Sequence, residues 1–377
     1  MRRLIIGVAV AATLAAPGQA ADPQRDEADR LFRQAEEAYQ ANEYARAAEL
    51  MGRSYQVFPI AETAFNAAAS YQNAGDMHQA QEYFARYLNH RPETRQDEAV
   101  RDAWQALENN PYGDDYELCA QLSRLLWTIN EAEGGEGFVG FRVIKEAARM
   151  AEFGLEAYRD FDFSRSGLMF ECSVEIHSVG ANLFNAGISY LYAGDYDASG
   201  RAFHRWAAGN ERGRDRRVQE ALESFDAEAS DTPAQRPRRC ARLSAVKEAI
   251  VVVNGLDAGP GAIENDATQY AEIARSLYRM DHFVQAGDLL RCAHQLVPDV
   301  GYLYDAAVAY IAAEEWLTAQ LSLQGYLAAQ PDVRRHPDVQ AAEAALEEDP
   351  YASDPHAAYN FRQLVEAIRR AEGRPQP

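Results

Sequence analysis

Apolar residues recur every three to four positions along most of the chain, and polar turns such as Asn42-Glu43 and Gly75-Asp76 separate the runs. This period places the apolar side chains on one face of an α-helix, and the turns divide the pattern into pairs of helices. The pattern therefore predicts an all-α protein of about 18 helices, with almost no strand.

One string of residues occurs three times. It begins at Phe65-Asn66-Ala67, returns at Phe184-Asn185-Ala186 and returns in weaker form at Tyr304-Asp305-Ala306, a period of about 120 residues. The first and third copies continue to agree as far as Pro111-Tyr112 and Pro350-Tyr351. Glycine-rich joints at Gly134–Gly140 and Gly255–Gly261 separate three tandem repeat units, which we place at residues 21–134, 141–255 and 262–372.

A shorter period of about 33 residues lies inside each repeat unit, as between Ala47 and Ala80. It resembles the tetratricopeptide repeat (TPR), a pair of antiparallel helices of about 34 residues. The matching positions are the small residues Ala35, Ala68, Gly187, Ala307, Ala47, Ala80 and Ala319, the aromatics Tyr44, Tyr196 and Phe283, and the closing prolines Pro59, Pro92, Pro298 and Pro331. The resemblance implies a TPR-like α-α solenoid, in which each hairpin buries its apolar face against its neighbours.

Six hairpins fit this pattern, although the one near Gly154–Ser178 lacks the closing proline. Each repeat unit then adds two more helices, at about 95–109 and 115–133 in the first unit. We interpret these as a diverged third hairpin with a longer turn around Asn110-Pro111-Tyr112-Gly113.

The first 20 residues have the features of a secretory signal: the charged start Met1-Arg2-Arg3, an apolar run from Leu4 to Ala16, and the small-residue exit Gly18-Gln19-Ala20. We expect this segment to be cleaved and the chain to reach the periplasm, with secretion beyond it possible; an uncleaved N-terminal anchor is the alternative. The formal net charge of −21 disfavours nucleic acid and anionic lipid as partners. No later segment is apolar enough to predict an integral membrane span.

The four cysteines occupy two repeated positions. Cys119 and Cys240 are equivalent on the last helix of units one and two, and Cys172 and Cys292 are equivalent on the second helix of units two and three. Cysteines therefore occur only where a unit has a neighbour to join. We predict disulfides Cys119–Cys172 and Cys240–Cys292, which an oxidising compartment permits; four buried free thiols are the alternative.

Patterns of catalytic or metal-binding residues are not found. The eight histidines never adopt the spacing that places two ligands on one helical face, and no phosphate-binding loop, nucleophile elbow or Cys-x-x-Cys pair occurs. We therefore predict no catalytic residue, no metal and no cofactor, and a protein that is not an enzyme. An enzyme whose site forms only in three dimensions stays an alternative.

The resemblance also implies that a partner lies in a concave groove lined by the first helix of each hairpin. Mapping that face gives the candidate binding residues Phe65, Asn66, Asn73, Phe184, Asn185, Tyr192, Tyr304 and Asp305. The two asparagines Asn66 and Asn185 match the common asparagine of the family, which hydrogen-bonds the backbone of an extended peptide. The leading hypothesis is a periplasmic scaffold or adaptor that mediates protein–protein interaction; a structural or self-assembling envelope component is the alternative.

Overall fold

The computed structural model describes residues 22–109, 115–134, 139–228, 232, 234–255, 262–348 and 354–373. Within these ranges the chain is helical, and no strand occurs. The chain divides into two compact bodies, the N-terminal body (residues 1–182) and the C-terminal body (residues 183–377). This division falls inside the second predicted repeat unit, whose boundaries stay predictions. The signal segment, the turn at 110–113 and most of the two glycine-rich joints lie outside the described residues.

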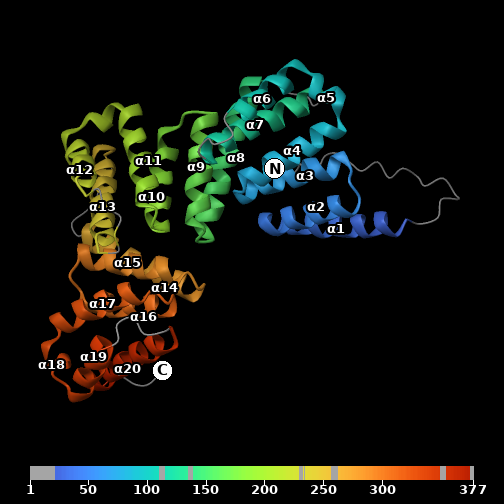
Figure 1. Ribbon diagram of the computed structural model, residues 1–377. Helices are drawn as coiled ribbons and strands as arrows, with labels where there is room; N and C mark the ends of the chain where they lie inside the picture. Colours follow the sequence, from blue (N-terminus) through green and yellow to red (C-terminus); the bar gives the residue numbers. More distant parts are fainter. Residues whose placement is uncertain are drawn as a thin grey trace. The chain divides into compact units, whose positions relative to one another are not determined.

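The N-terminal body contains four pairs of longer helices and one short helix, α5, among its described residues. They are drawn from blue to green in Figure 1: α1 Pro23–Gln40, α2 Tyr44–Val57, α3 Ala61–Ala74, α4 Met77–His90, α5 Pro92–Gln96, α6 Glu98–Asn109, α7 Asp115–Ala132, α8 Val139–Arg159 and α9 Phe163–Ile176. Helix α10 Gly180–Ala193 spans the division. The C-terminal body continues with α11 Tyr196–Gly209, the 3₁₀ helix η1 Glu211–Arg214, α12 Arg216–Asp226, α13 Arg236–Val253, α14 Ala262–Arg279, α15 Phe283–Leu296, α16 Val300–Ala312, α17 Trp316–Ala329, α18 Pro331–Arg334, α19 Pro337–Glu348 and α20 Asp354–Ala371.

The same tight turn closes each of the six predicted hairpins. One residue in each turn has a positive φ, namely Asn42, Gly75, Phe161, Gly194, Asp281 and Glu314. Glycine and asparagine adopt this left-handed conformation most readily, which explains why Asn42 and Gly75 are visible as turns in the sequence. The hairpin of α8 and α9 uses Phe161, a residue type that rarely adopts it. This hairpin is therefore complete, although its turn has no sequence signal.

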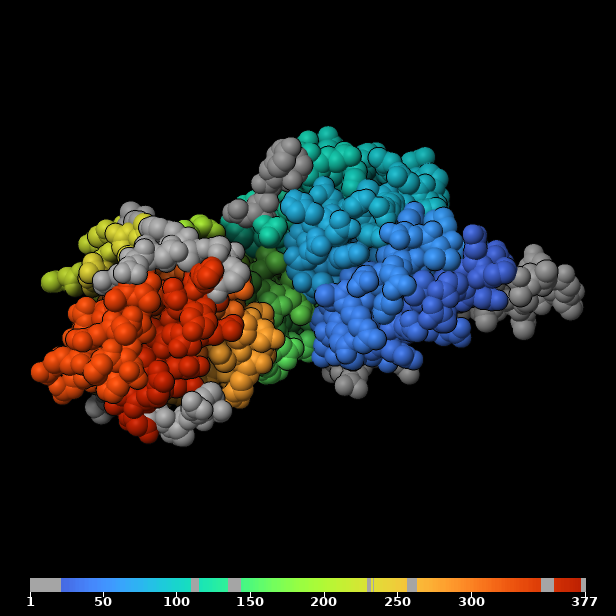
Figure 2. Space-filling view, turned by 60° about the horizontal axis from the view of Figure 1, so that its bottom comes forward, coloured from blue at the N-terminus to red at the C-terminus, as the bar shows by residue number. Residues whose placement is uncertain are grey.

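Small residues allow the two helices of a hairpin to approach closely. Ala35, Ala47, Ala68 and Ala80 are fully buried, as the resemblance implies. Serines in the second helices add hydrogen bonds across the pair: the Ser54 hydroxyl donates to the Ala28 carbonyl oxygen (2.8 Å). Buried alanine and a satisfied hydroxyl together give close packing without an unpaired polar group. In Figure 2 the blue side chains of the first two hairpins form a continuous surface.

The third hairpin of each repeat unit differs from the prediction. The expected helix at 95–109 is two helices, α5 and α6, and the equivalent short helices η1 and α18 precede α12 and α19. Proline begins α5 and α18, where its missing N–H costs no helical hydrogen bond. Helix α7 packs against α3, α4 and α9, whereas α6 packs against α5 and α7. The last helix of the unit thus contacts both the preceding and the following hairpins.

None of the described helices is long and apolar enough to cross a membrane.

Candidate functional site: first-helix faces and disulfide joints

Half of the eight candidate binding residues have buried side chains. Phe65, Asn73, Tyr192 and Tyr304 are at most 9% exposed. Asn66, Phe184 and Asn185 are half-buried, and Asp305 is exposed. A partner can therefore reach only the second group without rearrangement of the helices.

The buried aromatics pack on rings of the same body. Phe65 lies 5.2 Å from the Tyr87 ring and 5.8 Å from the Phe84 ring, centroid to centroid. Tyr192 meets Tyr270 edge-on at 5.5 Å. These geometries are those of aromatic core pairs.

The last helix of a repeat unit covers part of the predicted groove. On α20, the Arg369 guanidinium donates to the Tyr304 hydroxyl (2.9 Å). On α7, the Cys119 carbonyl oxygen and the Ser123 hydroxyl accept from the side-chain amide of Gln72 on α3, at 3.2 and 2.6 Å. The chain itself thus contacts Tyr304 on α16, a position that the resemblance assigns to a partner, and covers α3 at Gln72, next to the candidate Asn73.

Asn73 is held from two sides. Its amide nitrogen donates to the Tyr39 hydroxyl (2.7 Å), and its backbone oxygen accepts from the Arg165 guanidinium of α9 (2.8 Å). The Arg165 guanidinium also lies 4.9 Å from the centre of the Tyr44 ring. Asn73 therefore joins α1, α3 and α9, which is a packing role.

Phe184 and Asn185 lie next to each other on α10 and stay accessible. Phe184 contacts Phe203 of α11 at 6.0 Å between ring centroids, which leaves part of its ring exposed. Asp305 stands at the equivalent place on α16. In the C-terminal body, the first-helix face therefore keeps an aromatic, an amide and a carboxylate within reach of a partner. Asn66 is the accessible candidate of the N-terminal body.

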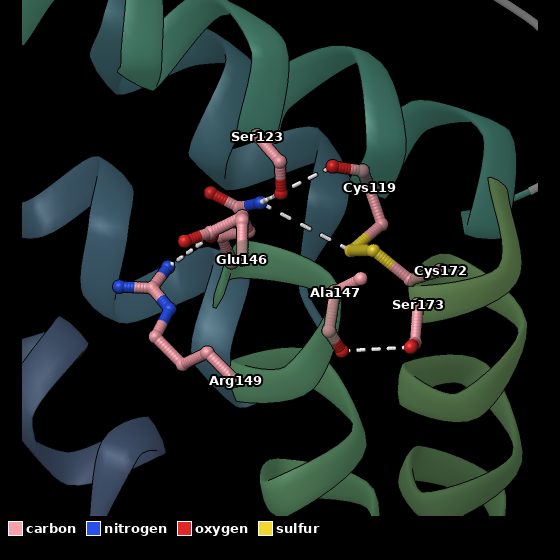
Figure 3. The surroundings of a disulfide bond; sticks show 8 residues. Cys119, Ser123, Glu146, Ala147, Arg149, Cys172 and Ser173 are labelled. Carbon is pink, nitrogen blue, oxygen red and sulfur yellow. Dashed lines mark hydrogen bonds and ion pairs between the residues drawn. A yellow bond between two sulfur atoms is a disulfide. The ribbon is translucent and has the colours of Figure 1, made fainter. Parts of the chain in front are cut away.

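The structure contains both disulfides with the pairing inferred from the repeat. Cys119 of α7 is bonded to Cys172 of α9, with 5.6 Å between their Cα atoms, so the beginning of α7 meets the second half of α9 (Figure 3). Ser123 lies on the α7 side of this bond, and on the other side the Ser173 hydroxyl donates to the Ala147 carbonyl oxygen (2.7 Å). Around this disulfide, α7 is therefore joined to α3 and to α9, and α9 is joined to α8.

The second joint has the equivalent disulfide and a buried ion pair. Cys240 of α13 is bonded to Cys292 of α15, with 5.7 Å between their Cα atoms. Nearby, the Lys247 ammonium lies 2.5 Å from the Asp266 carboxylate, and both residues are buried. Removing one partner of such a pair leaves a buried charge, so the pair fixes how α13 meets α14.

A further polar group lies at this end of the C-terminal body. The buried Asp288 carboxylate accepts from the Tyr310 hydroxyl (2.5 Å) and pairs with the Arg236 guanidinium (3.1 Å). Burial, and then the Asp288 charge, raise the pKa of the Tyr310 phenol well above its usual value. The sequence pattern does not reveal this triad, because its members lie on three different helices and only Tyr310 stands at a repeated position, with Tyr71 and Tyr190.

Two open hollows of the C-terminal body have equivalent linings. The first, of about 460 Å³, lies where α11, η1 and α12 meet and includes Arg214. The second, of about 360 Å³, lies where α17, α18 and α19 meet and includes Arg334.

Among the described residues, no group of three or more histidines, cysteines and carboxylates is arranged to hold a metal ion.

No protein-family model and no curated protein matches the sequence. Among solved structures, the TPR domain of P58(IPK) is similar with a TM-score of 0.24 and 14% identity, covering 92% of this chain and 97% of that one. The TPR2AB domain of yeast Sti1, in a structure titled as its complex with pHSP90, gives a TM-score of 0.18 and 13% identity, with coverage of 91% and 98%. Likeness at this level carries no information about a site or a partner. The all-α, TPR-like fold rests on the helices and turns described above.

Proposed function

We propose that this protein is a non-catalytic periplasmic scaffold that holds a protein or peptide partner on its first-helix faces. The observation that carries the proposal is the accessible pair Phe184 and Asn185 on α10, within a helix whose other face is packed. An aromatic ring offers a partner a large apolar contact, and an amide can donate to and accept from a peptide backbone. Of the buried candidates, Tyr192 lies on the same helix and anchors it through its contact with Tyr270.

The disulfides support the proposed compartment. Bonds such as Cys119–Cys172 persist in oxidising compartments and are rare where thiols are kept reduced. A buried bond at each joint therefore suits a chain that is exported after synthesis. Mass spectrometry of the protein recovered from cells should find an N-terminus near Ala21 or Asp22, and a chain that still begins at Met1 would count against export.

Partner binding can be tested at one position on α10. A photo-crosslinking amino acid placed at Asn185 in living cells should give discrete adducts with an envelope protein. The matched control is the same amino acid at Arg201, which is exposed on α11, the second helix of the same hairpin. Adducts that form equally from both positions, or from neither, would contradict binding at the first-helix face.

A further inference from the structure

The two hollows of the C-terminal body are copies of one site. Both are lined by the end of a second helix, a short helix and the start of the next long helix. Five positions of the two linings are equivalent in the repeat: Ala207 and Leu327, Ala208 and Ala328, Arg214 and Arg334, Gln219 and Gln340, and Leu222 and Glu343. We call them the Arg214 hollow and the Arg334 hollow. One alanine, the arginine and the glutamine are identical in both hollows.

In the Arg334 hollow the chain supplies its own carboxylate. Nη2 and Nε of Arg334 lie 2.8 and 3.1 Å from the two carboxylate oxygens of Glu343, a two-point pairing. The N-terminal body holds a third equivalent arginine, Arg95, whose guanidinium donates to the side-chain oxygen of Asn89 (3.0 Å). Two of the three repeated arginines therefore have an acceptor from the chain.

The Arg214 hollow lacks both acceptors. Leu222 stands at the position of Glu343, and Ala208 stands at the position of Asn89. Arg214 is exposed and has no hydrogen-bond or ion-pair partner within the described part of the chain. The hollow is also the larger one, at about 460 Å³ against 360 Å³.

Neighbouring charges do not satisfy Arg214. The Asp215 carboxylate pairs with Arg217 (3.0 Å), and the Glu220 carboxylate pairs with Arg216 (2.6 Å). The side-chain amide of Gln219 donates to the Gly213 carbonyl oxygen (2.6 Å). His204 also lines the hollow, and its Nε2 lies 3.0 Å from the Asp226 carboxylate. The hollow therefore presents one unpaired guanidinium beside the His204–Asp226 pair and above the buried Leu222.

We propose that the Arg214 hollow binds a glutamate side chain of a partner protein. A guanidinium recognises a carboxylate through two parallel hydrogen bonds, and Glu343 shows that a glutamate fits the equivalent position of this fold. The buried Leu222 would contact the methylene groups of the incoming side chain. This site is formed by α11, η1 and α12, so it goes beyond the proposed function on the α10 face and can be tested apart from it.

The test uses N-acetyl-glutamate amide as the probe and N-acetyl-glutamine amide as its neutral control. Both are titrated into the full mature chain, and the ¹⁵N–¹H resonance of the Arg214 Nε is followed by NMR, assigned by its loss in Arg214→Gln. The glutamate probe should shift this resonance saturably, with an apparent Kd in the millimolar range, the order expected for two parallel charge-assisted hydrogen bonds.

Two variants separate recognition from a structural effect. Ala208→Glu places a carboxylate where the N-terminal body has Asn89, on an exposed position, and should weaken binding by about tenfold by occupying Arg214 from within. Arg334→Gln changes the arginine that is already paired and should leave the titration unchanged. An equal response to the glutamine probe, equal binding of inorganic phosphate, or a titration that Ala208→Glu does not alter would overturn the proposal.

Discussion

Gly213 shows how closely one residue can fix the connection between two helices. A Cβ added at this position would lie 2.2 Å from the Ala207 carbonyl oxygen and 2.4 Å from its Cα. Backbone atoms cannot move aside as a side chain can. The glycine therefore lets η1 lie directly against α11, where Arg214 follows.

We predict that Gly213→Ala lowers the free energy of unfolding of the C-terminal body by about 1–3 kcal/mol, because the added methyl group overpacks this contact. The matched control is Gly209→Ala, also near the end of α11, where an added Cβ meets nothing within 4 Å. Urea unfolding followed by circular dichroism measures both. A Gly213→Ala midpoint equal to that of the control would show that the connection is looser than described.

Some single residues adopt conformations or environments that the sequence does not predict. The left-handed turns at Asn42 and Gly75 could be predicted because their residue types favour that backbone, whereas Phe161 gives no such signal. The buried state of Tyr304 could not be predicted either. Its position in the hairpin is that of a groove residue, but its ring packs on the Tyr326 ring at 5.5 Å and its hydroxyl accepts from Arg369, 65 positions further along the chain.

Among the helices, the last one of a repeat unit links neighbouring hairpins, as α7 does by contacting both α4 and α9. Sequence periodicity predicted α7 and its neighbours as a third hairpin but not the short helices α5, η1 and α18, which are too short to show a period. The cysteine positions were more informative than the apolar pattern here. Cys119 and Cys172 identified the contact between α7 and α9 because each cysteine recurs only beside a neighbouring unit.

At this scale we predict the effect of removing one bridge. Replacing Cys119 and Cys172 together by alanine should leave the helix content unchanged and lower the stability of the N-terminal body by about 4 kcal/mol or less, since the bond closes a loop with a sequence separation of 53 residues. Circular dichroism and urea unfolding measure the two quantities.

The second bridge provides the matched comparison. Replacing Cys240 and Cys292 should affect the C-terminal body in the same way, because its sequence separation is 52 residues. Peptide mapping without reduction should recover both bonds. A bond between Cys172 and Cys240, or a large loss of helix on removing either bridge, would contradict the role of the bonds as joints.

At the scale of the whole molecule, the outer faces of α2 and α20 are where a second copy of the chain would have to pack to extend the stack. Leu168 and Cys172 of α9 are buried, whereas their counterparts on α2, Glu49 and Arg53, are exposed. On α20, the counterpart of the buried Ser123 is the exposed Arg362, which lies beside the exposed Tyr359. A polar outer face such as that of α2 is typical of capping repeats and disfavours continuation of the stack by a second copy.

We therefore predict a monomer. Light scattering during gel filtration should give the mass of a single chain across a range of protein concentrations. As a control, the double change Glu49→Leu and Arg53→Leu should promote association, because it makes the α2 face apolar. Oligomers of the unchanged protein that grow with concentration would favour a self-assembling envelope component instead of a scaffold.

The pairing of the cysteines has a consequence for biosynthesis. Each bond joins a cysteine to the next one along the chain, 119 to 172 and 240 to 292. A chain that crosses a membrane from its N-terminus presents these thiols in the same order, so an oxidant that joins them as they arrive makes only native bonds. Correction of wrong pairs by thiol–disulfide exchange, which takes seconds to hours, is then unnecessary. If the chain is exported as we propose, its maturation should depend on the cell's disulfide oxidant and be indifferent to its disulfide isomerase.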